Sequence, residues 1–146
     1  MTYKEPYGAG QVPPWPRFGA DDLPRGVTLD ELAQAWLDPN EREWALQDAT
    51  EVCYGNPDVT WEFILRLLKA APTGDDLGRV AAGPLEDFIQ AFAHEQIDKM
   101  EMEAERNASF RDALKGVWFR GRNDETTLRL CALGCYDLNT KKERKE

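Results

Sequence analysis

Residues 81–104 read AAGPLEDFIQAFAHEQIDKMEMEA, and this stretch decides the fold class. Because proline removes a backbone donor, the Gly83-Pro84 pair is expected to break the preceding chain and a helix is expected to begin there. The apolar residues then recur at the spacing of one helix face. They are Leu85, Phe88, Ile89, Phe92, Ala93, Ile97, Met100 and Ala104. This series predicts either one long helix or two helices joined near His94.

The residues before this stretch carry helix start and stop signals. Thr28 with Glu31 forms a capping-box pattern ahead of an apolar face, which predicts a first helix. Asp38-Pro39 predicts the start of a second helix, and Gly55 predicts its end. Asn56-Pro57 predicts a third helix that Pro72 ends, and a brief fourth helix is expected over 75–82.

The residues after it predict two further helices, one capped by Asn107 or Ser109 and one starting near Asn123. No window shows the period-two alternation of a strand. The sequence therefore predicts an all-α protein, a compact antiparallel bundle of about six to seven helices over 28–138, with a short α-solenoid as the alternative. The last residues, 139–146, are expected to form a charged flexible tail.

Residues 1–27 hold five of the nine prolines and four of the eleven glycines. This composition predicts an extended arm rather than a helix. Trp15 and Phe18 lie within the arm and are expected to dock on the helices, with an exposed, ligand-like motif as the alternative.

Composition and charge restrict the class of function. The chain of 146 residues has 27 acidic and 18 basic residues and a net charge of -9, so its field repels nucleic acids and anionic membranes and attracts basic partners. No apolar run approaches the roughly 20 residues that span a bilayer. Three cysteines make no disulfide framework. We expect a soluble cytoplasmic protein with reduced thiols, no cofactor and no direct contact with nucleic acid or membrane.

Several motifs together resemble a family of bacterial helical domains of unknown function. The most specific is Ala81-Ala82-Gly83-Pro84-Leu85-Glu86-Asp87, and His94 also matches, although Glu95 follows it where the family more often has glycine. The other matching residues are Trp36-Leu37, the run 61–68 after Asn56-Pro57, Phe110, and 113–118 with its Gly-Val-Trp motif. The resemblance covers roughly residues 32–119 and implies an all-α fold and a bacterial or phage origin, but no mechanism.

Glu86, Asp87 and His94 are the first candidates for acid/base chemistry. In the first turn of a helix that begins at Pro84, the two acids would be favoured by the unpaired N–H groups and the helix dipole. His94 lies two turns further, about 10 Å along the helix axis from Asp87, which is too far for a direct pair. We therefore expect a structural role for all three residues and no catalytic site.

The three cysteines and the single histidine are the candidates for a metal site. Cys131 and Cys135 have helical i, i+4 spacing, and Cys53 and His94 would complete a Cys3His set. No Cys-x2-Cys pair supports zinc, so we expect small buried side chains and no bound metal.

The segment 94–106 carries a run of acidic residues. Glu95, Asp98, Glu101, Glu103 and Glu105 predict a solvated helix face or a recognition face for a basic protein. The segment 111–122 is basic and includes aromatic residues. Its candidate anion-binding residues are Arg111, Lys115, Trp118, Arg120 and Arg122, with Trp118 otherwise expected in the core.

Two functions fit these patterns. The first is a non-catalytic, acidic protein-interaction module, in the manner of an inhibitor or immunity protein that binds a basic nucleic-acid-processing effector. The alternative is a small enzyme or ligand-binding domain that recognises a phosphate-bearing molecule through Trp118, Arg120 and Arg122, with Glu86 or Asp87 as a base. Salt-sensitive binding of basic proteins favours the first, and stabilisation by nucleotides favours the second.

Overall fold

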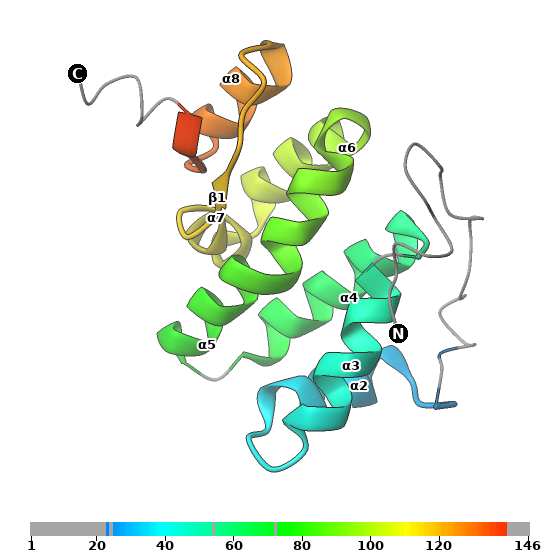
Figure 1. Ribbon diagram of the computed structural model, residues 1–146. Helices are drawn as coiled ribbons and strands as arrows, with labels where there is room; N and C mark the ends of the chain where they lie inside the picture. The colour runs from blue at the N-terminus through cyan, green and yellow to red at the C-terminus, as the bar shows by residue number, and fades with distance from the viewer. Residues whose placement is uncertain (1–22, 24, 54, 72, 140–146) are drawn as a thin grey trace. The chain divides into compact units, whose positions relative to one another are not determined.

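The computed structural model describes Leu23 and residues 25–53, 55–71 and 73–139, and the statements below concern those residues. The predicted all-α class is confirmed, because helices make up most of this part of the chain (Figure 1). The elements are α2 (Leu29–Leu37), α3 (Arg42–Cys53), α4 (Pro57–Ala70), α5 (Gly74–Val80), the π-helical turn η1 (Ala81–Leu85), α6 (Glu86–Arg106), α7 (Ala108–Leu114), β1 (Trp118–Phe119), α8 (Glu125–Ala132) and β2 (Tyr136–Asp137).

Some predictions fall on residues that are not described. The docking of Trp15 and Phe18 lies outside the described residues, as does the tail apart from Asn139. None of the described helices combines the length and the apolar character needed to cross a membrane.

The contacts divide the chain into two units, and the division falls between Phe63 and Ile64, inside α4. In the first unit the predicted capping box is confirmed. The hydroxyl of Thr28 accepts a hydrogen bond from the N–H of Glu31 at 3.0 Å, and the carboxylate of Glu31 accepts one from the N–H of Thr28 at 2.9 Å. The caps satisfy donors that the first turn of α2 leaves unpaired.

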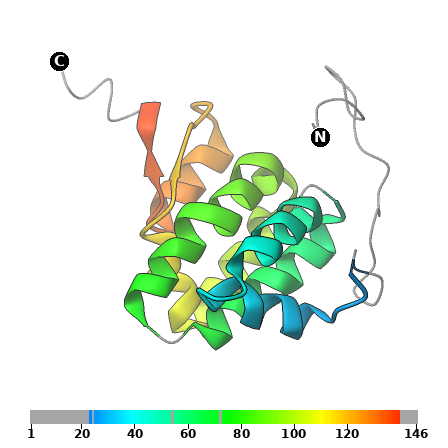
Figure 2. The same ribbon diagram turned by 60° about the horizontal axis from the view of Figure 1, so that its bottom comes forward.

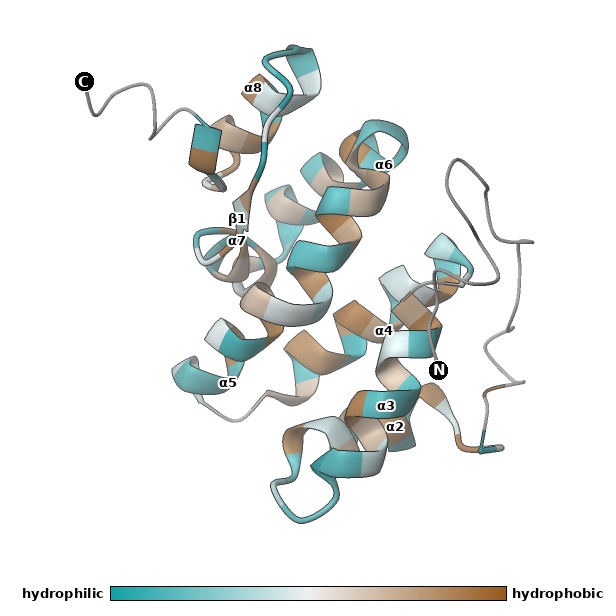
Figure 3. Cartoon of the chain, viewed as in Figure 1, coloured by the Kyte–Doolittle hydropathy of each residue, from teal (hydrophilic) through white to brown (hydrophobic). Residues whose placement is uncertain are grey.

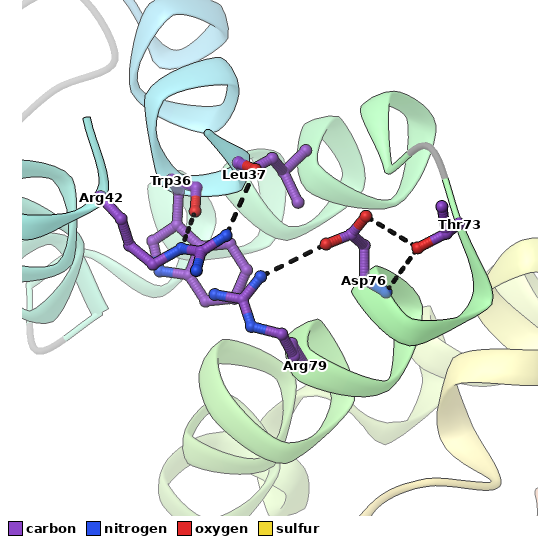
Figure 4. A network of polar contacts seen from close by, with 6 residues as sticks. All are labelled: Trp36, Leu37, Arg42, Thr73, Asp76 and Arg79. Carbon is purple, nitrogen blue, oxygen red and sulfur yellow. Dashed lines mark hydrogen bonds and ion pairs between the residues drawn. The ribbon is translucent and has the colours of Figure 1, made fainter. Parts of the chain in front are cut away.

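The predicted start of the second helix at Asp38-Pro39 is wrong by three residues. The side chain of Asp38 accepts a hydrogen bond from the N–H of Asn40 at 2.9 Å, and its carbonyl accepts one from Glu41 at 3.0 Å, so the chain forms a turn before α3. The first residue of α3, Arg42, donates to the carbonyls of Trp36 and Leu37 at 3.1 and 3.3 Å (Figure 4). The side chain of Arg42 thereby satisfies carbonyls at the end of α2.

The predicted start of the third helix is confirmed. The side-chain oxygen of Asn56 accepts a hydrogen bond from the N–H of Asp58 at 2.9 Å, and Pro57 occupies the first helical position of α4. The buried hydroxyl of Thr60 donates to the carbonyl of Val52 at 2.9 Å. Side chains of α4 thus supply part of the buried core of the first unit, with Val59, Trp61 and Phe63 all at most 6% exposed.

In the second unit the predicted break at Gly83-Pro84 is wrong, because the helix continues from α5 through η1 into α6. At its start Thr73 caps α5 by accepting from the N–H of Asp76 at 3.1 Å, and Arg79 pairs with Asp76 at 3.3 Å (Figure 4). Around Pro84 the N–H of Glu86 reaches the carbonyl of Ala81, five residues back. This wider turn accommodates a proline that would clash with the carbonyl four residues before it in a regular α-helix.

Helix α6 is one continuous helix, which resolves the alternative of a joint near His94. Hydrophobic and hydrophilic residues alternate along it (Figure 3), and the predicted apolar series is buried. Phe88 and Met100 are fully buried, and Leu85, Ile89, Phe92, Ala93, Ile97 and Ala104 are at most 8% exposed. The amphipathic pattern therefore identified the core face of this helix correctly.

The last elements of the second unit are α7, β1, α8 and β2. Asn107 caps α7 as predicted, accepting from the N–H of Phe110 at 3.1 Å. The sequence did not predict the two strands, which lie side by side in Figure 2. They pair in parallel, with Trp118 opposite Tyr136 and Phe119 opposite Asp137. Both β1 and α8 contact α6, so α6 is the helix on which the segment 117–139 is built.

Candidate functional site

The segment 117–122, which contains β1, alternates its side chains between the interior and solvent. Val117 and Phe119 are at most 3% exposed, whereas Trp118, Arg120 and Arg122 are exposed. In an extended chain, side chains two residues apart lie on the same face. Three members of the predicted anion-binding set therefore share the solvent face of one short segment.

A polar stripe on α6, formed by Glu86, Gln90 and His94, runs along this segment. The carboxylate of Glu86 accepts a hydrogen bond from the N–H of Trp118 at 3.3 Å. The amide of Gln90 accepts from the N–H of Arg120 at 3.0 Å and donates to its carbonyl at 3.4 Å. Glu86 and Gln90 are four residues apart on α6, a rise of ~6 Å, and Trp118 and Arg120 are two residues apart, ~6.7 Å in a strand. The spacing of the two helix side chains therefore matches the spacing of the two N–H groups that they bind. Helix side chains thus bind the edge of β1 as a neighbouring strand would.

Gly121 is held from the opposite side by the end of the described chain. Its N–H donates to Oδ1 of Asp137 at 2.9 Å, and its carbonyl accepts from the amide of Asn139 at 2.7 Å. Asp137 is only 5% exposed. A Cβ atom at position 121 would lie 2.6 Å from Cγ2 of Thr127 and would also overlap the carboxylate of Asp137. The close approach therefore requires glycine here.

The third residue of the Arg-Gly-Arg segment, defined as residues 120–122, is tethered through Thr127. The N–H of Arg122 donates to the hydroxyl of Thr127 at 2.9 Å, and that hydroxyl donates to Oδ1 of Asp124 at 2.8 Å. Asp124 is also the N-cap of α8 and accepts from the N–H of Thr127 at 2.9 Å. Side chains from α6, α8 and the C-terminal part therefore bond all three N–H groups of the segment.

Arg120 and Arg122, which this hydrogen-bonded backbone carries, are exposed, and within the described part of the chain no partner binds their guanidinium groups. Other arginines of the same unit are used internally. Arg111 donates to the carbonyl of Ala104 near the end of α6, and Arg129 pairs with Asp98 and Glu101. Arg120 and Arg122 thus differ from these arginines, because their backbone is held in place while their side chains have no partner among the described residues.

His94 lies beside this pair. Its Nε2 is 2.8 Å from Oδ2 of Asp124, and its side chain is 48% exposed. A small hollow of about 20 Å³ opens here, large enough for about one water molecule, so a ligand would bind on its rim. Its polar lining residues are Gln90, His94, Arg120, Arg122, Thr126 and Thr127. The geometry brings histidine, both arginines and two hydroxyls around one point on the surface.

The hydrogen bonds from His94 and then from Thr127 hold the pKa of Asp124 well below its ordinary value. A carboxylate with a depressed pKa stabilises the fold above its unfolded pKa of about 3.9, and this contribution is lost as the pH falls toward the folded pKa. We expect Asp124→Asn to lower the unfolding midpoint in urea at pH 7 and to have a smaller effect at pH 3. Asparagine also caps helices, so the change mainly removes the charge. An equal effect at both pH values would contradict this assignment, and Asp112→Asn, at an exposed pair with a 3.9 Å separation, is the matched control.

Comparison with known proteins identifies the family. The model of a family of unknown function, DUF6869, matches residues 33–134. The chain belongs to this family. No curated protein and no solved structure matches the chain. The DUF6869 region contains the Arg-Gly-Arg segment, the polar stripe and Asp124, whereas the tethers Asp137 and Asn139 lie beyond its end.

The acidic residues predicted as a partner face lie in this DUF6869 region, and the structure separates them. Glu95 and Glu105 are exposed. Asp98 and Glu101 bind Arg129 at 2.6 and 2.9 Å, and the hydrogen bond from Arg129 lowers the pKa of Glu101. These two acids therefore hold α8 against α6.

Glu103 lies on the other side of α6 and is only 7% exposed. Its carboxylate accepts hydrogen bonds from Arg106 at 2.9 Å and from Asn107 at 2.8 Å. Desolvation raises the pKa of Glu103, but these hydrogen bonds outweigh it, so the pKa lies below its ordinary value. Glu103 therefore fixes the junction between α6 and α7.

The predicted anion-binding set is also divided. Arg111 is bonded to the end of α6, and Lys115 lies 3.9 Å from Asp112 and outside the hollow. Trp118 is 52% exposed, so its expected place in the core is wrong. Its ring packs on Tyr136 at a centroid distance of 5.4 Å, because β1 pairs with β2 at the surface.

Glu86 and Asp87 lie in the first turn of α6 as predicted, but α6 continues from η1, so this turn is not the free helix start that was expected and the N–H of Glu86 is bonded to the carbonyl of Ala81. Partial burial raises the pKa of Glu86, against the opposing effect of the Trp118 hydrogen bond. His94 pairs with Asp124, an acid 30 residues away that the sequence reasoning did not connect with it. The structural role expected for Glu86 agrees with its bond to β1.

The cysteines are thiols, and Cys135 and Cys131 differ in environment. Burial raises the pKa of Cys135 to about 12, whereas Cys131 is exposed, contrary to the expectation of two buried side chains on one helix face. The reason is that α8 ends at Ala132 and the chain turns at Gly134 with φ of 112°. Among the described residues no group of three His, Cys, Asp or Glu could hold a metal ion.

Sequence reasoning found the arginines by their charge but missed the residues that position them. Gln90, Thr127, Asp137 and Asn139 are separated from the segment by 5 to 30 residues. The glycine between two arginines is the local signal that could have suggested a close backbone approach.

Proposed function

We propose that this protein is a non-catalytic binding module that recognises an anionic group, phosphate or carboxylate, through Arg120 and Arg122. The observation that carries the proposal is the contrast within one segment. Its backbone is bonded on every N–H, whereas its two guanidinium groups are exposed and without a partner in the described residues.

This arrangement suits recognition because the backbone of the segment is already ordered before a ligand binds. The conformational entropy lost on binding is then mainly that of the two arginine side chains. A guanidinium group presents planar donors that match phosphate and carboxylate oxygens in bidentate geometry. The surrounding body carries net negative charge, so a compact anion that fits between the arginines is favoured over an extended polyanion.

The test is a calorimetric titration of the full chain with ribose 5-phosphate and with an acidic peptide. We expect Arg120→Gln or Arg122→Gln to weaken binding of the recognised anion by about tenfold each, because each removes a charge-assisted hydrogen-bonding group. Lys69→Gln, which removes the same charge from an exposed residue on α4, is the control and should leave the affinity unchanged. Binding that is equally weak in all variants, or absent in the wild type for both probes, would refute the proposal.

A second candidate function uses the acidic face of α6. Glu95 and Glu105 are exposed and the chain has a net charge of -9, which suits an inhibitor or immunity-type protein that binds a basic nucleic-acid-processing effector. A double variant, Glu95→Gln with Glu105→Gln, distinguishes the two candidate functions. It should weaken binding to a basic protein and leave the binding of an anion at Arg120 and Arg122 unchanged. Glu101 and Glu103 are unsuitable for such a test because both stabilise the fold.

A further inference from the structure

Trp118 is an exposed aromatic residue on the same face as the arginine pair. About half of its surface, 52%, is open to solvent. Its ring packs on Tyr136 with an interplanar angle of 48°, and its backbone is bonded to Glu86 and paired with β2. The indole is therefore exposed and held in place, as a stacking platform requires.

The three exposed side chains of the segment stand in order, Trp118, Arg120 and Arg122. Trp118 lies in β1, and Arg120 follows it two residues later, which corresponds to ~6.7 Å in an extended chain. Arg120 and Arg122 line the same small hollow, so an aromatic side chain is followed along the chain by two cationic groups that lie near one point. A ligand with a planar ring at one end and an anionic group at the other matches this order.

We infer that the ligand is a single nucleotide, a nucleoside monophosphate, whose base stacks on Trp118 and whose phosphate binds Arg120 and Arg122. This inference rests on the proposed function, because it uses the same arginines. Stacking on an aromatic side chain tolerates different bases, since every base has a π-face. One ribose separates base from phosphate and spans the step from the indole to the guanidinium groups.

The charges around the segment favour one nucleotide over a nucleic acid strand. Glu86 lies at Trp118, Asp87 follows it, and Asp124 and Glu125 follow Arg122. These carboxylates and the net charge of -9 would repel the further phosphates of a strand. The hollow beside the arginines is also small, about 20 Å³, which suits contact with one phosphate on its rim.

The experiment compares adenosine 5′-monophosphate, ribose 5-phosphate and adenosine by calorimetry with the full chain. We expect the mononucleotide to bind about tenfold more tightly than ribose 5-phosphate, because only it can stack. Trp118→Ala should remove this difference, whereas Trp118→Phe should retain most of it. Leu128→Ala truncates another exposed apolar side chain, 70% exposed, and should change neither affinity. Thermal unfolding of each variant confirms that it is folded.

The outcomes separate this inference from the proposed function. Equal affinity for the mononucleotide and ribose 5-phosphate, with no effect of Trp118→Ala, would contradict the inference that the ligand is a nucleotide. The proposed function as an anion-binding module would still stand. If the acidic peptide binds in a manner that depends on the arginines and neither phosphate probe binds, the nucleotide inference is likewise wrong and the proposed function still stands. If no phosphate probe and no acidic peptide binds, both the inference and the proposed function fail.

Discussion

Gly121→Ala is expected to lower the free energy of unfolding by about 3 kcal/mol. The added Cβ would lie 2.6 Å from Cγ2 of Thr127 and would overlap the carboxylate of Asp137. Neither side chain can withdraw freely, because Thr127 is bonded to Arg122 and Asp124, and buried Asp137 is bonded to the N–H of Gly121. Urea denaturation followed by circular dichroism measures the loss.

Gly78→Ala is the matched control for this prediction. Gly78 lies inside α5, and apart from its chain neighbours and the backbone of its own helix nothing lies within 4 Å of a Cβ built there. Alanine is the better helix former, so the same substitution should here raise the free energy of unfolding by about 0.5–1 kcal/mol. A Gly121→Ala variant as stable as the wild type would show that the Arg-Gly-Arg segment is not fixed as described.

Phe88→Ala is expected to cost about 4 kcal/mol of the free energy of unfolding. Phe88 is fully buried on α6, and its ring lies 5.6 Å from that of Phe92, so truncation leaves a cavity in the core of the second unit. The control lies on the same helix. Met102 is 62% exposed, and Met102→Ala should change the stability by no more than about 0.5 kcal/mol. Similar midpoints for the two variants in urea would contradict the assignment of the core face of α6.

Features of the fold that depend on near neighbours in the sequence could be predicted. The capping box of Thr28 and Glu31 and the caps at Asn56 and Asn107 each involve residues two or three positions apart. The buried face of α6 follows from the 3.6-residue period alone. Each of these signals involves residues close together in the sequence, so it can be recognised without knowledge of the tertiary structure.

The features that could not be predicted depend on partners that are distant in the sequence or on an unusual local geometry. β1 and β2 pair residues 18 positions apart, and His94 meets Asp124 across 30 positions. Asp98 and Glu101 could not be recognised as partners of Arg129 from an acidic run alone. Charge identified Arg120 and Arg122 as candidates, but only tertiary structure shows which arginines have a partner among residues 25–139 that the structure describes.

The π-helical turn at Pro84 has a consequence for how α5 and α6 face relative to each other. A turn with one extra residue offsets the angular phase of the residues after it by about 100° relative to an uninterrupted helix. The buried face of α6 and the stripe of Glu86, Gln90 and His94 both follow the turn, so they keep the same phase, whereas α5 precedes it. Deleting one residue between Ala81 and Leu85 would therefore rotate the side chains of α5 by about 100° relative to the stripe. The length of a single helical turn thus sets which face α5 presents when α6 holds the arginine segment.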